Sequence, residues 1–210
     1  MLRNSQKIIL LAVILTLLGF CAFVLSSCVK KEIKNTNSSG KNIICFGDSI
    51  TFGYGVNPGQ DYPTHLAKMV NRPVINAGVD GDTSIEGSKR IKRDVLDKQP
   101  YLVLIEFTGN DFLKKVPLYT TIDNLKEMIR QIQGAGAITA IVDVSAGLFL
   151  LDYRIQLSKL ARETESIFIP ATLSGIITNP SMKSDFMHPN AGGYVIVAQR
   201  VCRGIEDYIK

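Results

Sequence analysis

Four short segments of this chain hold the residue types that nucleophilic attack on a carbonyl group requires. They are Gly47-Asp48-Ser49 and residues 78–83, 108–111 and 185–188. A serine hydroxyl is a weak nucleophile at neutral pH and needs a base within hydrogen-bond reach. The first segment offers such a nucleophile in Ser49, and the last offers an acid–base pair in Asp185 and His188.

His188 is the predicted base, and the chain has only two histidines. It follows Asp185 by three residues, so one loop can hold the Asp185 carboxylate against one ring nitrogen while the other nitrogen faces Ser49. The carboxylate of such a triad fixes the tautomer and stabilises the imidazolium that forms. The second histidine, His65, lies at a predicted helix start and is interpreted as a surface or packing residue.

Three groups are predicted to stabilise the negative charge that develops on the carbonyl oxygen. Donors for this charge must point at it before the reaction begins. The backbone N–H of Ser49, the backbone N–H of Gly81 and the side-chain amide of Asn110 are the candidates, and Gly81 can approach closely because it has no Cβ. Each segment alone also fits an ordinary turn, so the ordered set of four carries the prediction.

The elements that must position these groups alternate between strand-like and helical patterns. The predicted strands are uninterrupted apolar runs, typical of strands covered on both faces, at residues 42–46, 73–76, 102–107, 138–144 and 167–169. Helical patterns occupy residues 63–70, 83–97, 121–133, 152–164 and 190–208. This order predicts an α/β fold, a three-layer α/β/α sandwich with a mostly parallel, flavodoxin-like sheet of about five strands. The predicted site lies beyond the carboxyl ends of these strands.

These segments resemble the four sequence blocks of the SGNH (GDSL) hydrolases. The resemblance extends from about residue 43 to the C-terminus and includes the compact bacterial arylesterase, lysophospholipase and thioesterase group. It implies a triad of Ser49, His188 and Asp185, and an oxyanion hole made by Ser49, Gly81 and Asn110. It also implies that no metal and no organic cofactor takes part.

Other residues bear on the scaffold and on the substrate. Thr108 stands where many members of the family have glycine, and this small change is expected to be harmless. Residues 145–151 replace a loop that shapes the acyl pocket in this group. Their apolar character favours an apolar acyl chain or an aromatic ester, although the same run also suits packing under a helix. Asp48 is expected to brace the nucleophile turn and Asp111 its own loop.

Residues 1–28 have the pattern of an export signal that ends in a lipidation site. Arg3 and Lys7 precede an uncharged apolar run of 18 residues, and Leu25-Ser26-Ser27-Cys28 follows as in a bacterial lipobox. The resemblance implies cleavage before Cys28 and a diacylglycerol on its sulfur. The alternative is an uncleaved transmembrane anchor, because 18 residues are just long enough to span a bilayer. Both place the following domain outside the cytoplasmic membrane.

Residues 29–41 are polar and predict a flexible tether, which leaves residues 42–210 as the hydrolase domain. The formal charge of +5 falls to +3 when the signal is removed, with 22 basic and 19 acidic residues remaining. This charge is small, and no basic block with interleaved aromatics occurs, so nucleic-acid binding is not expected. Cys45 and Cys202 are expected to be separate thiols, although export would permit a disulfide.

The sequence therefore predicts a serine esterase that is lipid-anchored on the extracytoplasmic face of the bacterial cell envelope. Its expected substrates are small acyl esters, lysophospholipids or thioesters, cleaved through an acyl-enzyme on Ser49. A carbohydrate or cell-wall O-acetylesterase, acting on an acetylated glycan, is the alternative enzyme. A non-catalytic tethered binding protein on a relic hydrolase fold is the alternative of another class, although such relics usually lose a triad member.

Overall fold

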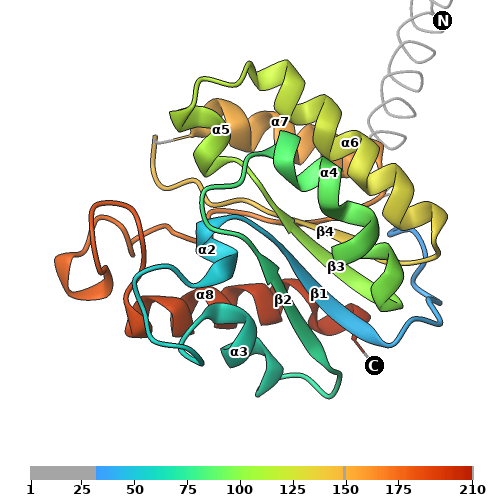
Figure 1. The fold of residues 1–210 in the computed structure, drawn as a ribbon, viewed down its shortest axis with the longest axis horizontal. Helices are drawn as coiled ribbons and strands as arrows, with labels where there is room; N and C mark the ends of the chain where they lie inside the picture. The colour runs from blue at the N-terminus through green and yellow to red at the C-terminus, as the bar shows by residue number, and fades with distance from the viewer. Residues whose placement is uncertain (1–31, 149, 210) are drawn as a thin grey trace, which may run out of the picture. The chain divides into compact units, whose positions relative to one another are not determined.

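A parallel sheet forms the middle layer of the domain in the computed structural model, which describes residues 32–148 and 150–209 (Figure 1). Its strands are β1 (Asn42–Gly47), β2 (Val74–Gly78), β3 (Pro100–Glu106), β4 (Ile138–Val142) and β5 (Ile167–Ile169). They lie in the order β2-β1-β3-β4-β5, which is the flavodoxin-like order. The predicted fold class is confirmed, and all five predicted strands are present.

Helices cover both faces of the sheet. The longer ones are α3 (Tyr62–Ala67), α4 (Ser84–Asp94), α6 (Leu118–Gly134), α7 (Leu151–Glu163) and α8 (Ala191–Ile205), and 3-10 turns occupy Leu96–Lys98, Pro180–Met182 and Glu206–Tyr208. Figure 1 shows α3 and α8 on one face and α4, α6 and α7 on the other. Two short helices, α2 (Ser49–Phe52) and α5 (Gly109–Leu113), were not predicted. Helices of four or five residues are too short to leave a periodic pattern.

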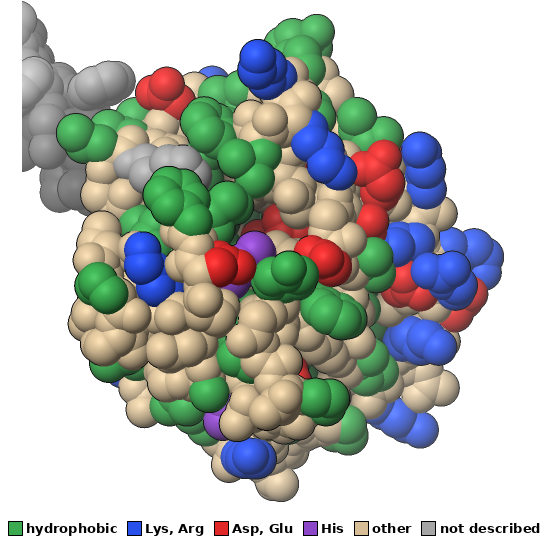
Figure 2. Space-filling model, turned by 60° about the vertical axis from the view of Figure 1, so that its left-hand side comes forward, with side chains coloured by type: hydrophobic (Ala, Val, Ile, Leu, Met, Phe, Trp, Pro, Cys, Tyr) green, Lys and Arg blue, Asp and Glu red, His purple; other side chains and the backbone are tan. Residues whose placement is uncertain are grey.

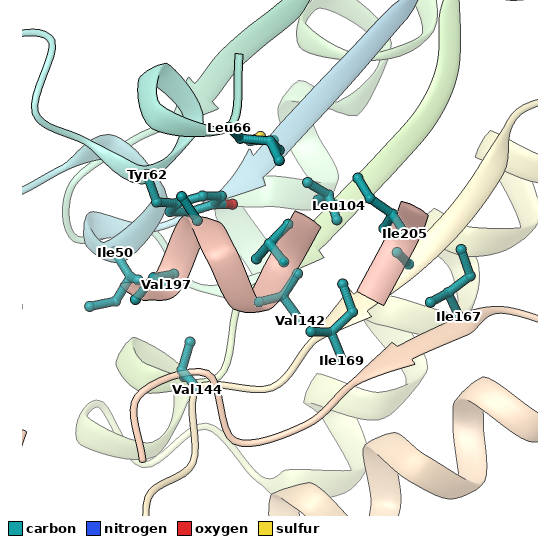
Figure 3. Close-up of a cluster of buried hydrophobic side chains, with 14 of the residues drawn as sticks. Ile50, Tyr62, Leu66, Leu104, Val142, Val144, Ile167, Ile169, Val197 and Ile205 are labelled. Carbon is teal, nitrogen blue, oxygen red and sulfur yellow. The ribbon is translucent and has the colours of Figure 1, made fainter. Parts of the chain in front are cut away.

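Successive strand residues point to opposite faces and so supply two separate cores. In β1, Ile43 and Cys45 join the cluster beneath α3 and α8, whereas Ile44 and Phe46 join the cluster beneath α4, α6 and α7. Figure 3 shows the first cluster, with side chains of the sheet facing those of α3 and α8. Because both faces of each central strand are buried, the strands read as continuous apolar runs.

Part of the predicted tether is hydrogen-bonded to the domain. Asn35 donates through Nδ2 to the carbonyl oxygens of Gln133 and Ala137, at 2.9 and 3.0 Å. These bonds hold part of the predicted tether, residues 29–41, on the surface of the domain. The polar composition that suggested a free linker also serves to satisfy carbonyl groups at the end of a helix. Within the described part of the predicted tether, Asn35 is therefore not free of the domain.

The predicted signal, its cleavage site and Cys28 lie outside the described residues. Within the described ranges, no helix is both long enough and apolar enough to cross a membrane. Cys45 is buried and Cys202 is partly buried, and both are free thiols.

Candidate active site

Ser49 follows β1 at the carboxyl end of the sheet, where the strand order reverses between β1 and β3. Open α/β sheets bind ligands at this position. Asp48 precedes it as the N-cap of α2, and its Oδ1 accepts a hydrogen bond from the backbone N–H of Ile50 at 3.0 Å. This bond fixes the turn that presents the serine hydroxyl, in agreement with the bracing role expected for Asp48.

Ser49, His188 and Asp185 come together although 139 positions separate the serine from the histidine. Ser49 Oγ lies 3.0 Å from His188 Nε2, and His188 Nδ1 lies 2.8 Å from Asp185 Oδ2. Asp185 Oδ1 also accepts the backbone N–H groups of Met187 and His188, at 2.7 and 2.9 Å. With Nδ1–H directed at the carboxylate, Nε2 is left free to accept the serine proton.

Neighbouring groups set the pKa of Asp185 and the orientation of the His188 ring. Partial burial raises the pKa of Asp185, but hydrogen bonds from Met187 and His188 outweigh it and hold the pKa below its ordinary value. Asp185 therefore stays a carboxylate at neutral pH, which is the form that accepts Nδ1–H. The ring of Tyr54 packs on the imidazole, with 4.5 Å between the ring centroids. This contact limits how the imidazole can turn, and no local sequence pattern indicates it.

Two of the three predicted oxyanion donors, Ser49 and Asn110, line one cavity. Asn110 donates through Nδ2 to Asp48 Oδ2 at 3.3 Å, so one hydrogen of its amide is bound and the second is available. Gly81 lies outside the lining of this cavity, on the loop between β2 and α4. Its φ of +80° suits glycine, and the site of its absent Cβ is open space. The backbone conformation at this position therefore favours glycine, and the predicted approach of its N–H to the oxyanion stays a prediction.

The cavity beside Ser49 has a volume of about 250 Å³ and a mainly apolar wall. The apolar residues in that wall are Ile50, Val144, Ala146, Leu150, Leu173, Ile177, Phe186 and Met187. Ala146 and Leu150 belong to the predicted pocket loop, residues 145–151, and Leu150 also packs in the core. Figure 2 shows hydrophobic side chains gathered on this face around acidic side chains and a histidine.

Residues 45–196 match the GDSL-like Lipase/Acylhydrolase family. This chain belongs to that family. It is a serine hydrolase that acts on ester bonds. Thioesterase 1/protease 1/lysophospholipase L1 of Escherichia coli (strain K12) is 24% identical to it over 180 residues, which cover 82% of this chain and 86% of the relative. The uncharacterized lipoprotein YqeF of Bacillus subtilis (strain 168) is 33% identical over 79 residues, covering 34% of this chain and 32% of the relative.

Solved structures share the fold of this GDSL hydrolase. TesA superposes with a TM-score of 0.75 at 23% identity, covering 80% of this chain and 99% of the other. A two-domain esterase active on acetylated mannans, CEX, superposes with a TM-score of 0.67 at 22% identity. That match covers 84% of this chain and 51% of the esterase. The arrangement of strands and helices is therefore that of known esterases.

The structure corrects the interpretation of Asp111 in the GDSL hydrolase. Its carboxylate accepts the backbone N–H and the hydroxyl of Ser84, at 2.7 and 2.6 Å, and the hydroxyl of Thr121 at 2.6 Å. Asp111 thus joins α4 and α6 rather than holding its own loop. Thr83 caps α4 in a capping box with Glu86. His65 is partly buried on α3 and does not line the cavity beside Ser49.

Two functional-site residues of the hydrolase were missed. Arg90 donates to the carbonyl oxygens of Ala77 and Gly47, at 2.8 and 2.9 Å, and so ties the ends of β2 and β1 together. An arginine within a helix leaves no sequence signal for this role. Glu106 is buried at the end of β3, where Thr51 Oγ1 donates to its Oε2 at 3.1 Å. The sequence could have indicated Glu106, because it is the only charged residue in the apolar strand Pro100–Glu106.

Proposed function

We propose that this GDSL hydrolase cleaves carboxylic esters with Ser49 as the nucleophile, His188 as the base and Asp185 as the carboxylate that orients it. The observation that carries the proposal is the 3.0 Å separation of Ser49 Oγ and His188 Nε2. Ser49 attacks the ester carbonyl while His188 takes its proton, and the leaving alcohol then receives that proton from His188. Water attacks the acyl-enzyme in the reverse sequence and frees the acid.

The oxyanion formed by this attack is held by the backbone N–H groups of Ser49 and Gly81 and by the Asn110 amide. The position of Asn110 in the wall of the cavity supports its role. Its bond to Asp48 supports it further, because an amide held before the reaction stabilises developing charge without having to reorganise. Gly81 is included on the family pattern and on its place in the loop that follows β2.

The favoured substrate is an ester or thioester with an apolar acyl chain, of the lysophospholipid or fatty-acyl type. The wall formed by Val144, Leu150 and Leu173 supports this choice, because each methylene buried there gains about 0.8 kcal/mol. A two-carbon acetyl group would leave most of a 250 Å³ cavity unfilled. The similarity to a relative named for thioesterase and lysophospholipase activities favours the same substrate class.

O-acetylesterase activity on a glycan is the second candidate, because the fold is shared with an esterase active on acetylated mannans. A series of p-nitrophenyl esters from acetate to laurate, run beside an acetylated mannan, separates the two candidates. We expect kcat/KM to rise with acyl length beyond acetate and deacetylation of the mannan to be negligible. A maximum at acetate together with release of acetate from the mannan would favour the second candidate.

The serine assignment is tested with Ser49→Ala in the purified protein. We expect loss of ester turnover by about 10⁶-fold and loss of labelling by a fluorophosphonate probe. Ser158→Ala, which changes a serine on α7 bonded to Arg162, is the matched control and should keep both. Labelling that persists in Ser49→Ala would move the nucleophile elsewhere. A well-folded wild-type protein that takes no label would favour the non-catalytic alternative.

We further propose that Cys28 carries a lipid that anchors the domain on the extracytoplasmic face of the membrane. Cleavage before Cys28 would remove residues 1–27, and the residues after Cys28 would tether the domain to the lipid. The lipobox pattern and the partial similarity to a Bacillus lipoprotein support this. Cys28→Ala should block labelling with a radioactive fatty acid and leave an unprocessed precursor, whereas Cys21→Ala should be processed normally. Normal processing and labelling of Cys28→Ala would contradict the anchor.

A further inference from the structure

A pair of carboxyl groups lies directly beneath the nucleophile turn. Glu106 ends β3 and is in register with Gly47 of β1. Asp48, the residue after Gly47, therefore lies next to Glu106. Both side chains are 1% exposed, and Glu106 Oε2 lies 3.4 Å from the backbone N of Asp48. Two neighbouring carboxyl groups that are both shielded from water disfavour double ionisation, so we expect the pair to hold one proton at neutral pH.

The surroundings favour Glu106 as the holder of this proton. Asp48 faces N–H donors with both of its oxygens, from Ile50 and from Asn110, which suits a carboxylate. Glu106 Oε1 is buried and has no hydrogen-bond partner among the described residues, which disfavours a negative charge on this carboxyl group. Burial, together with the nearby charge of Asp48, raises the pKa of Glu106 well above its ordinary value.

The residues around the Glu106 carboxyl group leave space for it and hydrogen-bond to it. Its Oε2 accepts from Thr51 Oγ1 at 3.1 Å and lies 3.4 Å from the backbone N–H of Asp48. At Gly47, an added Cβ would lie 2.2 Å from Thr51 Oγ1 and 2.8 Å from Glu106 Oε2. The glycine of the Gly-Asp-Ser segment therefore leaves the space that Glu106 and Thr51 occupy.

Asp48 connects this pair to the proposed oxyanion hole. Its Oδ2 accepts one hydrogen of the Asn110 amide, so the position of Oδ2 decides where the second hydrogen points. We propose that Glu106 is a positioning residue, whose protonated carboxyl group holds Asp48 so that Asp48 aims the Asn110 amide at the oxyanion. With a proton on Glu106, the two carboxyl groups together carry one negative charge instead of two beneath the developing oxyanion. This inference rests on the oxyanion role proposed for Asn110.

A double-mutant cycle tests whether Glu106 acts through Asn110. Glu106→Leu and Glu106→Gln are made in the wild-type chain and in Asn110→Ala, and kcat and KM are measured on a p-nitrophenyl ester. We expect Glu106→Leu to lower kcat by about 10- to 100-fold with KM nearly unchanged, and to cost less than about twofold in the Asn110→Ala background. Glu106→Gln should keep kcat within about threefold, because its amide can still donate to Asp48.

The outcomes separate this inference from the proposed function. An equal loss from Glu106→Leu in both backgrounds would overturn the role of Glu106 while leaving Asn110 in place. Full activity of Asn110→Ala by itself would remove the oxyanion assignment of Asn110 and this inference with it, but would leave the Ser49 labelling result intact. A loss above tenfold in Glu106→Gln would also overturn the inference, because it would mean that an ionised carboxylate is needed.

A spectroscopic measurement keeps the inference testable if Glu106→Leu does not fold. The infrared spectrum of the wild-type protein in D₂O at pH 7 should contain the C=O stretch of a protonated carboxylic acid. Glu106→Gln should lack this band, and the matched control Glu127→Gln, which changes an exposed glutamate paired with Arg130, should keep it. A wild-type spectrum without the band, or a band that persists in Glu106→Gln, would overturn the proton assignment.

Discussion

Asp185 and His188 belong to one exposed loop. Ser49 and Asn110 instead follow β1 and β3 and lie over a set of buried polar residues, here called the floor: Asp48, Thr51 and Glu106. The Asp185 side chain is 42% exposed, and its hydrogen bonds with the described residues are to Met187 and His188, within three positions of it. On the floor, by contrast, Thr51 bonds to Glu106 across 55 positions and Asp48 bonds to Asn110 across 62. The loop holds its own geometry, while the floor depends on the whole sheet. Substitutions in the loop should therefore cost activity alone, and substitutions in the floor should cost stability as well.

The largest effect should come from the loop without a loss of stability. Asp185→Asn keeps the shape of the side chain but no longer fixes the tautomer of His188, so we expect kcat to fall by about 10⁴-fold. The Tm should stay close to that of the wild type, because the group is exposed. Asp152→Asn, at an exposed aspartate in the first turn of α7, is the control. A fall in Tm as large as that of a core variant would contradict the division between loop and floor.

Asn110→Ala should have the next largest effect, at the boundary between the two regions. Losing one oxyanion donor costs about 10²- to 10³-fold in kcat. KM should change little, because the interaction is made mainly in the transition state. Steady-state kinetics on one p-nitrophenyl ester measure this, with the exposed Asn57→Ala as control. A rise in KM at constant kcat would instead assign Asn110 to substrate binding.

Thr51→Val should reverse the pattern seen in the loop. The substitution removes the hydroxyl that donates to Glu106 Oε2 and lies 3.3 Å from the hydroxyl of Tyr62, at a site with no access to solvent. We expect a loss of about 1–3 kcal/mol in the free energy of unfolding, measured by urea titration. Activity of the folded protein should stay within about fivefold, since Thr51 touches no reacting group. A stability equal to that of wild type would show that the floor tolerates unpaired groups.

The smallest effect concerns the pH dependence of stability. Because burial raises the pKa of Glu106 in the folded state, the unfolded chain releases a proton that the native state retains. The contribution of Glu106 is therefore favourable below about pH 4.3, the ordinary value for glutamate, and is lost as pH rises above it. Glu106→Gln removes this pH-dependent contribution, because glutamine does not ionise. The Tm of the variant minus the Tm of the wild type should therefore increase from pH 4 to pH 8. We expect a rise of at least about 2–4 °C, and a constant difference would contradict it.

Much of the fold and of the loop follows from local patterns in the sequence. Continuous apolar runs marked all five strands, because strands buried on both faces must be apolar throughout. The three-residue spacing of Asp185 and His188 was enough to predict their pairing, because a single loop brings them together. The capping of α4 by Thr83 was equally local. Where partners are near in sequence, residue type and spacing carry most of the information.

The polar contacts between residues far apart in the sequence, including those of the floor, were found only in the tertiary structure. Asp111 was assigned to its own loop, yet it bonds to Ser84 and Thr121 on two other helices. Glu106 was missed, and its proximity to Asp48 could not be found without the register of β1 and β3. Asn35 was placed in a tether and instead bonds to the end of α6. The sequence by itself determined which segments are buried and which residues share a loop, because both depend on neighbours along the chain. The pairing of buried polar groups depends on strands and helices that meet only after folding, so no local pattern records it.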